Sequence, residues 1–336
     1  MTSYTRLRGL AAPLLPGLML SATIAAAAAF LSAHYGAPAM LLALLLGMAF
    51  NFLHDEGPCR AGIEFAAKFI LRLGVGLLGI RIAFEDLAQI GLQGAGLLVA
   101  LIVLTIATGF IVAPLFQRKW RFALLTGGAV AICGASAALA LAAVIPHNDK
   151  TERNTLFTVM AVTALSTIAM VAYPLLFQGL GFSEVQQGFL IGATIHDVAQ
   201  VVGAGFSVSA SAGEMATIVK LFRVAMLPVV LVVIVLVLKL AGPRTTQGPI
   251  PLLPWFMVLF LVLVGLGSTV ALPGALVSQV ELVSRACLIT AIAALGAKTS
   301  LRVLREVGGG HLAIVVIETL VLLSLATAAL LWLDWL

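Results

Sequence analysis

Three polar side chains that could do chemistry, His196, Asp197 and Gln200, lie within five residues of one another inside a long apolar segment. An ionisable group inside a membrane is costly and normally has a partner or borders a water-filled cavity. Glycine lets a helix bend or break. The segment therefore predicts either a substrate or proton site in a carrier, or a His–Asp pair that joins two helices. The flanking glycines are Gly188, Gly192, Gly203 and Gly205.

The same segment offers two kinds of ion coupling. His196 could carry a proton, because the charge of histidine changes near neutral pH, and Asp197 could hold the imidazole or carry the proton itself. His196 and Gln200 are four residues apart, so they share a helix face. A sodium site is the alternative use, because hard cations prefer oxygen ligands such as Asp197, Gln200, Thr194 and freed carbonyls. The sequence leaves both open.

A second segment, 122–145, is built from Gly, Ala, Ser and Cys and predicts a broken or tightly crossing helix. The start of a half-helix supplies N–H groups and a partial positive charge to an anion. Lys220 and Arg223 could add formal charge, and they share a helix face. Snorkelling of both side chains to the membrane interface is the alternative. The candidate residues for binding an anion are Gly127, Gly128, Cys133, Gly134, Ser136, Lys220 and Arg223.

Glu318 is a further candidate, because it lies in the middle of a predicted membrane span. It falls outside the two segments above and ranks below His196 and Asp197. The three cysteines, Cys59, Cys133 and Cys287, are far apart and give neither a disulfide framework nor the spacing of metal ligands. We therefore expect no bound metal and no cofactor beyond a coupling H⁺ or Na⁺.

The composition requires that these residues sit in a membrane. The 336 residues are 62% hydrophobic and 10% charged, with a mean hydropathy of +1.15. Apolar runs of about 20 residues recur along the whole chain, long enough to cross the hydrocarbon core. A β-barrel is excluded, because its strands alternate and are only about 10 residues long. The net charge of +5 is explained by cytoplasmic loops rather than by nucleic-acid binding.

We predict a single integral membrane domain over 1–336, all-α and polytopic, with about eleven transmembrane helices. The fifth and seventh helices are predicted to be broken or crossing. The bias of Lys and Arg, including the cluster at 117–121, predicts a cytoplasmic N-terminus and an outside C-terminus. The predicted spans are 11–33, 37–53, 63–84, 92–114, 122–145, 154–178, 187–207, 215–240, 253–272, 282–301 and 311–333.

An internal repeat relates the third predicted span to the tenth. Residues 78–91 read LGIRIAFEDLAQIG and residues 295–308 read LGAKTSLRVLREVG. A constant offset of 217 residues aligns Leu78 with Leu295, Gly79 with Gly296, Leu87 with Leu304 and Gly91 with Gly308. The same alignment pairs Arg81 with Lys298, so both copies have a cation at this position. The alternative is that both are ordinary cations at the edges of loops. Seven spans is an odd separation, so the copies would cross the membrane in opposite directions, as in many secondary carriers.

Five stretches together resemble the YeiH-like family of bacterial inner-membrane proteins, whose family name assigns them sulfate export. They are LGIRIAFEDLAQIG, AICGASAALALAAV, GATIHDVAQVVGAG, VKLFRVAMLPVVL and LGAKTSLRVLREVG. The resemblance runs from about residue 35 to the end of the chain. That family is similar to the cation–proton antiporter and bile-acid sodium symporter superfamily. The resemblance implies inverted repeats, crossing broken helices and a rocking or elevator-like motion.

These observations predict a secondary active transporter of the bacterial inner membrane that moves a small anion, sulfate by the family name, coupled to H⁺ or Na⁺. The alternatives are a carrier of organic anions, such as sulfonates or carboxylates, and a Na⁺/H⁺-type antiporter. A passive channel and an intramembrane enzyme using Asp197, His196 and Cys133 or Ser136 are more remote, and we expect no enzyme. The expected partners are the anion and the lipid bilayer. Analogy with such carriers suggests a homodimer.

Overall fold

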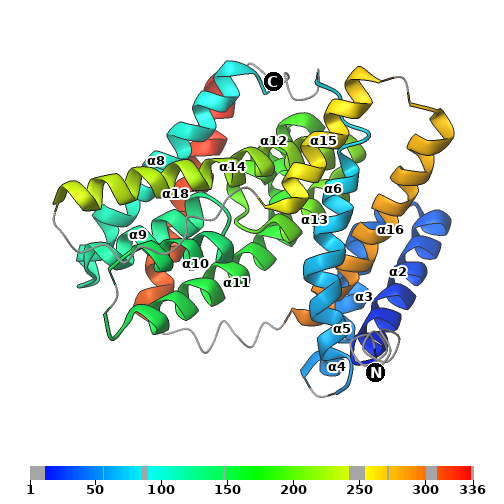
Figure 1. Ribbon diagram of the computed structural model, residues 1–336, viewed down its shortest axis with the longest axis horizontal. Coiled ribbons are helices and arrows are strands. Elements are labelled where there is room, and N and C mark those ends of the chain that lie inside the picture. The colour runs from blue at the N-terminus through cyan, green and yellow to red at the C-terminus, as the bar shows by residue number, and fades with distance from the viewer. Residues whose placement is uncertain are drawn as a thin grey trace, which may run out of the picture. The chain divides into compact units, whose positions relative to one another are not determined.

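Helices joined by short turns make up the computed structural model, which describes residues 12–55, 57–84, 90–146, 148–241, 254–270, 272–299 and 309–333 (Figure 1). No strand occurs among these residues. Six helices in this described part of the chain are long and apolar enough to cross a membrane. This confirms the prediction of an all-α membrane protein. The six are α2 (Leu15–Tyr35), α8 (Gly91–Leu115), α11 (Thr151–Gly179), α14 (Ala210–Ala241), α16 (Gly274–Lys298) and α18 (Gly309–Leu333).

The chain forms two compact units, each built from separate stretches of sequence. Unit 1 contains residues 1–88, 202–213 and 255–300, and unit 2 contains residues 89–201, 214–254 and 301–336. Helices α13 (Val198–Val208) and α14 contribute residues to both units. Every candidate site residue named from the sequence belongs to unit 2, so the predicted site lies within one unit.

Unit 1 is held together by unusually close helix crossings. A Cβ added to Gly47, in α3 (Ala39–Ala49), would lie 2.2 Å from the carbonyl oxygen of Ala293 in α16. A Cβ added to Gly296 would lie 2.3 Å from the carbonyl oxygen of Leu44. Small residues permit such close approach between backbones, which replaces the hydrophobic driving force that lipid does not supply. These glycines are therefore packing residues.

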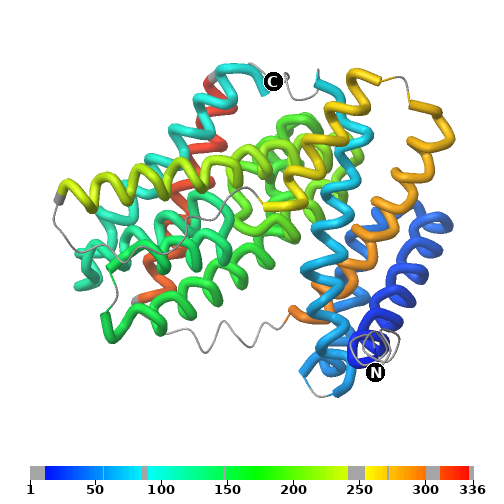
Figure 2. Tube along the Cα trace, in the orientation of Figure 1, coloured from blue at the N-terminus to red at the C-terminus, as the bar shows by residue number. Residues whose placement is uncertain are grey.

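The two helices that carry the sequence repeat run antiparallel in unit 1. The predicted third span, 63–84, corresponds to one uninterrupted helix over 60–78. It consists of α5 (Arg60–Phe65), a π-helical turn η1 (Ala66–Ile70) and α6 (Leu71–Leu78). The beginning of this helix, at Ile63, packs near Ala294 and Ala297 of α16, whereas Gly74, later in the same helix, packs against Leu288. Rising numbers in one helix therefore meet falling numbers in the other (Figure 2).

The contacts around the aligned glycines are also matched. A Cβ on Gly79 would meet the carbonyl oxygen of Phe260, in α15 (Trp255–Thr269), at 2.3 Å. A Cβ on Gly296 meets α3 at the same distance. The offset of 217 aligns Gly79 with Gly296. When the same offset is added to the residue numbers of α3, the result falls within the bounds of α15. Arg81 donates to Glu281 of α16 at 2.7 Å. Of the other aligned residues, Leu87, Leu304 and Gly308 lie outside the described residues.

In unit 2, α8 and α18 form a second antiparallel pair. Val112 and Ala113 of α8 pack with Ile314 of α18, whereas Gly109 lies against Glu318. Both helices are 25 residues long, and they begin at Gly91 and Gly309. Their bounds are close to the predicted spans 92–114 and 311–333. The apolar length of each segment therefore placed both helices correctly.

The fifth predicted span, 122–145, is broken as expected but also folds back on itself. Its two halves are α9 (Trp120–Ala131) and α10 (Ala135–Val144). A Cβ on Gly128 would lie 2.4 Å from Cδ1 of Leu141, thirteen residues later, although a straight helix would separate these positions by about 20 Å. The segment is therefore a helical hairpin. The predicted break is present, but counting the segment as one of eleven crossings was wrong, because its two halves fold back on each other.

The two ends of the hairpin meet at one end of unit 2. Arg118, just before α9, lies 3.4 Å from Nδ1 of His311 in α18. Phe157, near the start of α11, stacks on the same imidazole with ring centroids 5.0 Å apart. Arg153 lies over the Phe157 ring. The predicted span 122–145 separates the loops that carry Arg118 and Arg153 and so places them on opposite sides of the membrane. The hairpin is the reason that they lie together.

Candidate functional site

A second break interrupts the helix that contains the His–Asp–Gln segment. Helix α12 (Glu184–Thr194) begins with a capping box, in which Ser183 and Gln186 each accept from the other's backbone N–H. It ends at Thr194, and α13 begins at Val198, so Ile195, His196 and Asp197 form the break. The predicted interruption of the seventh element is therefore present.

The first break, between α9 and α10, is formed by Ile132, Cys133 and Gly134. Gly134 has φ +62° and ψ −120°, a conformation that side chains with a Cβ rarely adopt. A Cβ placed on Gly134 would lie 3.4 Å from the Cβ of His196. The two breaks therefore touch, although they are more than sixty residues apart in the sequence.

We expect Gly134→Ala to destabilise the protein by about 1–3 kcal/mol, the usual cost of a strained backbone at a residue with a Cβ. Gly179→Ala is the matched control, because an added Cβ there meets nothing within 4 Å. The measurement is the thermal unfolding midpoint of each purified variant in detergent. Equal midpoints for the two variants would contradict the assigned turn geometry.

Lys220 of α14 lies between the two breaks. Its ammonium group donates to the carbonyl oxygens of Ile132 and Ile195, each at 2.9 Å, and to that of His196. The residue is fully buried. All three N–H donors are therefore used by backbone groups, and these carbonyls belong to the last turns and breaks of α9 and α12.

Arg223, one turn further along α14, completes the same arrangement and is also buried. Its Nε donates to Ala131, its Nη1 to Gly192 and Ile195, and its Nη2 to Val130 and Ala131. The five bonds, between 2.7 and 3.1 Å, use all five guanidinium N–H groups. The C-terminal end of a helix carries a partial negative charge, so a cation there is stabilising.

The structure thus gives Lys220 and Arg223 a role different from the predicted one. Both were expected either to bind the anion directly or to extend to the membrane interface. Their donors are fully occupied by the carbonyls of two helix ends, and both side chains are buried within unit 2. We therefore assign them to neutralising the two breaks rather than to direct contact with a substrate.

His196 is fixed by hydrogen bonds to two other helices. Its backbone N–H donates to Oγ of Ser166 in α11 at 3.2 Å. Its Nε2 lies 2.9 Å from Oγ1 of Thr319 in α18, and that hydroxyl donates its own proton to the carbonyl oxygen of Val315. Thr319 is therefore the acceptor, which favours the imidazole tautomer with the proton on Nε2. The imidazole is buried.

The remaining coupling candidates are arranged around the second break. Gln200 is buried, and its Nε2 lies 3.4 Å from Oγ1 of Thr167, while its Oε1 has no hydrogen-bond partner. Thr194 donates back to the carbonyl oxygen of Leu190, within its own helix. Asp197 is only partly buried, at the start of α13. Of this group, Asp197 alone is partly exposed.

Two helix starts lie beside the breaks. The first backbone bonds of the following helices are Ala138 N–H to Gly134 in α10 and Val201 N–H to Asp197 in α13. The N–H groups before those positions have no partner within their helices. Ser136, in the first turn of α10, is exposed. This arrangement places two partial positive charges next to each other, with polar side chains at each.

The other predicted anion-binding residues have packing roles. Gly127 allows α9 to approach the backbone of Ile106 in α8, with an added Cβ at 3.1 Å, and Gly128 packs within the hairpin. Cys133 is buried at the turn. Glu318 is fully buried and accepts from Oγ1 of Thr126 at 2.8 Å.

Sequence reasoning missed the hydroxyl partners of these groups, namely Thr126, Ser166, Thr167 and Thr319. Each sits in an apolar helix and offers no local pattern, because its role appears only when another helix packs against it. The sequence signal available for them is a serine or threonine on the helix face that packs against a neighbouring span with a buried ionisable residue.

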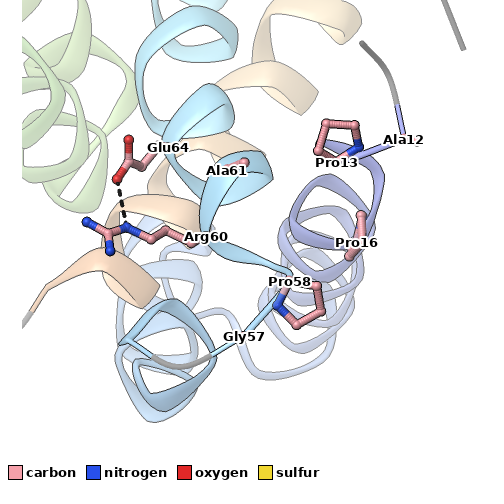
Figure 3. A pocket seen from close by; sticks show the side chains of 8 residues that line it. All are labelled: Ala12, Pro13, Pro16, Gly57, Pro58, Arg60, Ala61 and Glu64. Carbon is pink, nitrogen blue, oxygen red and sulfur yellow. Dashed lines mark hydrogen bonds and ion pairs between the residues drawn. The ribbon is translucent and has the colours of Figure 1, made fainter. Parts of the chain in front are cut away.

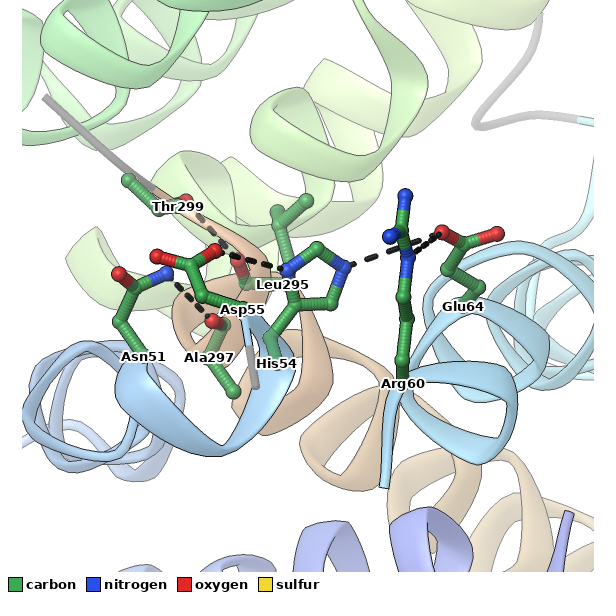
Figure 4. A network of polar contacts seen from close by, with 8 residues as sticks. All are labelled: Asn51, His54, Asp55, Arg60, Glu64, Leu295, Ala297 and Thr299. Atoms are coloured by element: carbon green, nitrogen blue, oxygen red, sulfur yellow. Dashed lines mark hydrogen bonds and ion pairs between the residues drawn. The ribbon is translucent and has the colours of Figure 1, made fainter. Parts of the chain in front are cut away.

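Unit 1 holds a separate polar cluster and a pocket, and none of the predicted site residues contributes to either. His54 lies between the carboxylates of Asp55, at 3.5 Å, and Glu64, at 3.8 Å (Figure 4). Arg60 donates to Glu64 at 3.4 Å. Glu64 and Arg60 also line the pocket near the start of α2, with Pro13, Pro16 and neighbouring residues (Figure 3).

Comparison with known proteins identifies relatives over almost the whole chain. The family model described as "Conserved hypothetical protein 698" matches residues 16–316. The UPF0324 membrane protein TauZ of Paracoccus denitrificans is 51% identical over 327 residues, covering 96% of each chain. The UPF0324 inner membrane protein YeiH of Escherichia coli is 34% identical over 312 residues, covering 88% of this chain and 87% of YeiH. No solved structure matches.

Proposed function

The chain belongs to the UPF0324 family of membrane proteins, and on that premise we propose that it is a secondary active transporter of a small anion. The observation that carries the proposal is the meeting of two broken helices whose carbonyl ends are neutralised by Lys220 and Arg223. Broken helices that meet inside a bundle are typical of carrier binding sites.

The charge at the breaks favours an anion over a cation. Lys220 and Arg223 bring two formal positive charges, and Asp197 brings one negative charge, so one positive charge is in excess. The carbonyl oxygens of the breaks are already hydrogen-bonded, whereas the starts of α10 and α13 still offer N–H groups. An oxyanion takes such donors readily. Sulfate, which the resemblance implies, is an oxyanion of this kind.

Because the carbonyl oxygens of the breaks are already hydrogen-bonded, the proton is also favoured over sodium as the coupling ion. A sodium site at the breaks would need oxygen ligands, but the carbonyl groups there already accept hydrogen bonds from Lys220 and Arg223. Asp197 is partly exposed beside the helix starts. We propose that the Asp197 carboxylate faces the helix starts when the site is empty and takes up a proton when the anion enters.

Alternating access between inverted halves is the proposed mechanism. It is supported by the two antiparallel pairs, α6 with α16 and α8 with α18, whose members are separated by 217 or 218 residues. The matched contacts of Gly79 and Gly296 also support it. We further propose that the protein lies in a bacterial inner membrane with a cytoplasmic N-terminus and an outside C-terminus, and that a homodimer is its oligomer.

We expect proteoliposomes containing the full chain to accumulate radiolabelled sulfate when a pH gradient is imposed, and Asp197→Asn to lose this gradient-driven uptake. The reason is that the amide cannot exchange a proton. Asp149→Asn is the matched control, because Asp149 is an exposed residue in the loop before α11. Equal uptake by both variants would refute a coupling role for Asp197.

The same assay tests the substrate and the class of protein. A folded wild-type protein that moves no sulfate would refute sulfate, and organic sulfonates and carboxylates would then be tested. Proton movement driven by a sodium gradient without any anion would instead identify a Na⁺/H⁺-type antiporter. Failure to move any anion under any gradient would refute the proposed function.

A further inference from the structure

A buried carboxyl group lies inside unit 2 at a place that the proposed mechanism does not use. Glu318 is in the middle of α18, and none of its surface is exposed. Its Oε1 accepts from Thr126 of α9 at 2.8 Å, and its Oε2 has no hydrogen-bond partner. A charged carboxylate in such surroundings lacks the partner that buried charges normally require.

The space for this carboxyl group is built by a glycine. A Cβ added to Gly109 of α8 would lie 2.7 Å from Oε1 of Glu318 and 2.7 Å from the carbonyl oxygen of Ala123. The carboxyl group therefore enters the gap between α8 and α9, where only a residue without a side chain fits. The site thus combines one acid, one hydroxyl and one glycine from three helices.

No cation among the described residues forms an ion pair with Glu318. Among the described residues of unit 2, α8, α9, α11 and α12 pack against α18. Among the described residues, α8 carries no titratable or charged group, and the only hydrogen bond to the Glu318 side chain comes from Thr126. The titratable or charged residues of the other helices, with the adjoining loop and breaks, are Arg118, Lys119, Arg121, Glu152, Arg153, Tyr173, Glu184, Cys133, His196, Asp197 and His311.

Thr126 can serve a carboxyl group in either protonation state. Its hydroxyl has one proton, and Oγ1 lies near three acceptors, namely Glu318 Oε1, the Phe122 carbonyl oxygen at 3.1 Å and the Ala123 carbonyl oxygen at 3.4 Å. When Glu318 is ionised, the hydroxyl donates to the carboxylate. When Glu318 is protonated, the hydroxyl donates to a backbone carbonyl and accepts from the acid.

We propose that Glu318 is a second proton-binding site, distinct from Asp197, and that its proton moves with the transported anion. The reaction is the addition of one proton to the carboxylate to give the neutral acid, with no other bond changed. The neighbouring residue on α18, Thr319, holds the imidazole of His196. A shift of α18 that accompanies protonation of Glu318 would therefore reach the second break directly. The link to transport rests on the proposed function, whereas the proton site does not.

The first experiment detects the proton without any substrate. Infrared spectra of the full-length protein in lipid, recorded over a pH titration, show the C=O stretch of protonated carboxylic acids. We expect one such band in the wild type and in Asp197→Asn that is absent in Glu318→Gln, whose amide keeps the size and the acceptor of the acid. An identical set of carboxylic acid bands in the wild type and in Glu318→Gln would overturn the proposal.

A second pair of variants tests the site if Glu318→Gln does not fold. Gly109→Ala places a methyl group on the carboxyl oxygen and should change the pH at which the band is lost, whereas Gly96→Ala, on the same helix with nothing within 4 Å, should not. An equal response from both variants would overturn the assigned site.

The transport arm separates a coupling role from a structural one. We expect Glu318→Gln to retain exchange of labelled for unlabelled sulfate across the membrane and to lose at least half of the acceleration that a pH gradient gives the wild type. A carboxyl group that only cross-links helices would leave the response to the pH gradient unchanged. If the wild type moves no sulfate, the proposed function fails on its own, and the infrared result still decides whether Glu318 holds a proton.

Discussion

Lys220→Met is expected to lower the free energy of unfolding by about 3–5 kcal/mol, an amount that removes much of the stability of an ordinary domain. Methionine has a similar length but no donor, so the buried carbonyl oxygens of Ile132 and His196 lose their bond from Lys220. The carbonyl oxygen of Ile195 loses the same bond but keeps the one from Arg223. An unsatisfied buried acceptor costs about 1–3 kcal/mol. Part of this cost is offset, because the variant no longer buries the Lys220 ammonium group beside the charged Arg223.

The measurement is the thermal midpoint of the purified variant, together with the fraction that elutes as a single species from size-exclusion chromatography. Lys239→Met is the matched control, because Lys239 is an exposed lysine near the end of the same helix, and we expect its effect to stay within about 0.5 kcal/mol. A stable Lys220→Met with weakened anion binding would return Lys220 to the direct role that the sequence had suggested.

Gly47→Val is expected to destabilise unit 1 by about 4 kcal/mol or more, the range reserved for severe core damage. Its Cβ would lie 2.2 Å from the carbonyl oxygen of Ala293 and 3.0 Å from the N of Ala297, and both atoms belong to backbone. Side-chain rotation cannot relieve such contacts, so α3 and α16 would have to separate by about 1 Å and lose their packing.

Gly265→Val provides the comparison, because an added Cβ on that glycine of α15 meets nothing within 4 Å. Both variants place the same β-branched side chain in a helix, so the difference between their midpoints isolates the close crossing. Equal midpoints would show that α3 and α16 do not approach as closely as described.

Apolar length was enough to predict the long helices but not the hairpin. The expected spans 92–114 and 311–333 agree with α8 and α18 to within two residues at each end. The stretch 122–145 is equally long and apolar, so hydropathy predicted one crossing there. The reversal depends on the backbone angles of Gly134, and a glycine in a sequence does not reveal whether a helix kinks or turns back.

The residue types predicted where the candidate site lies in the chain. They did not predict which groups its side chains bond to. An acid, a histidine and an amide in an apolar helix identified the second break correctly. The partners of Lys220 and Arg223 could not be predicted, because a backbone carbonyl has the same chemistry at every residue. Only the fold decides which carbonyls lose their partners. Glu318 was noticed for its charge alone, since the contribution of Thr126 and Gly109 requires three helices to meet.

The eight hydrogen bonds of Lys220 and Arg223 have a mechanical consequence. The two side chains join residues 130–132 to residues 192–196, and all of their donors are engaged. Pulling the two breaks apart would take carbonyl acceptors away from buried cations in the membrane, at a cost far above thermal energy. The breaks and the part of α14 that carries Lys220 and Arg223 should therefore move as one rigid body. In the proposed transporter, a gate would then be formed elsewhere in the chain.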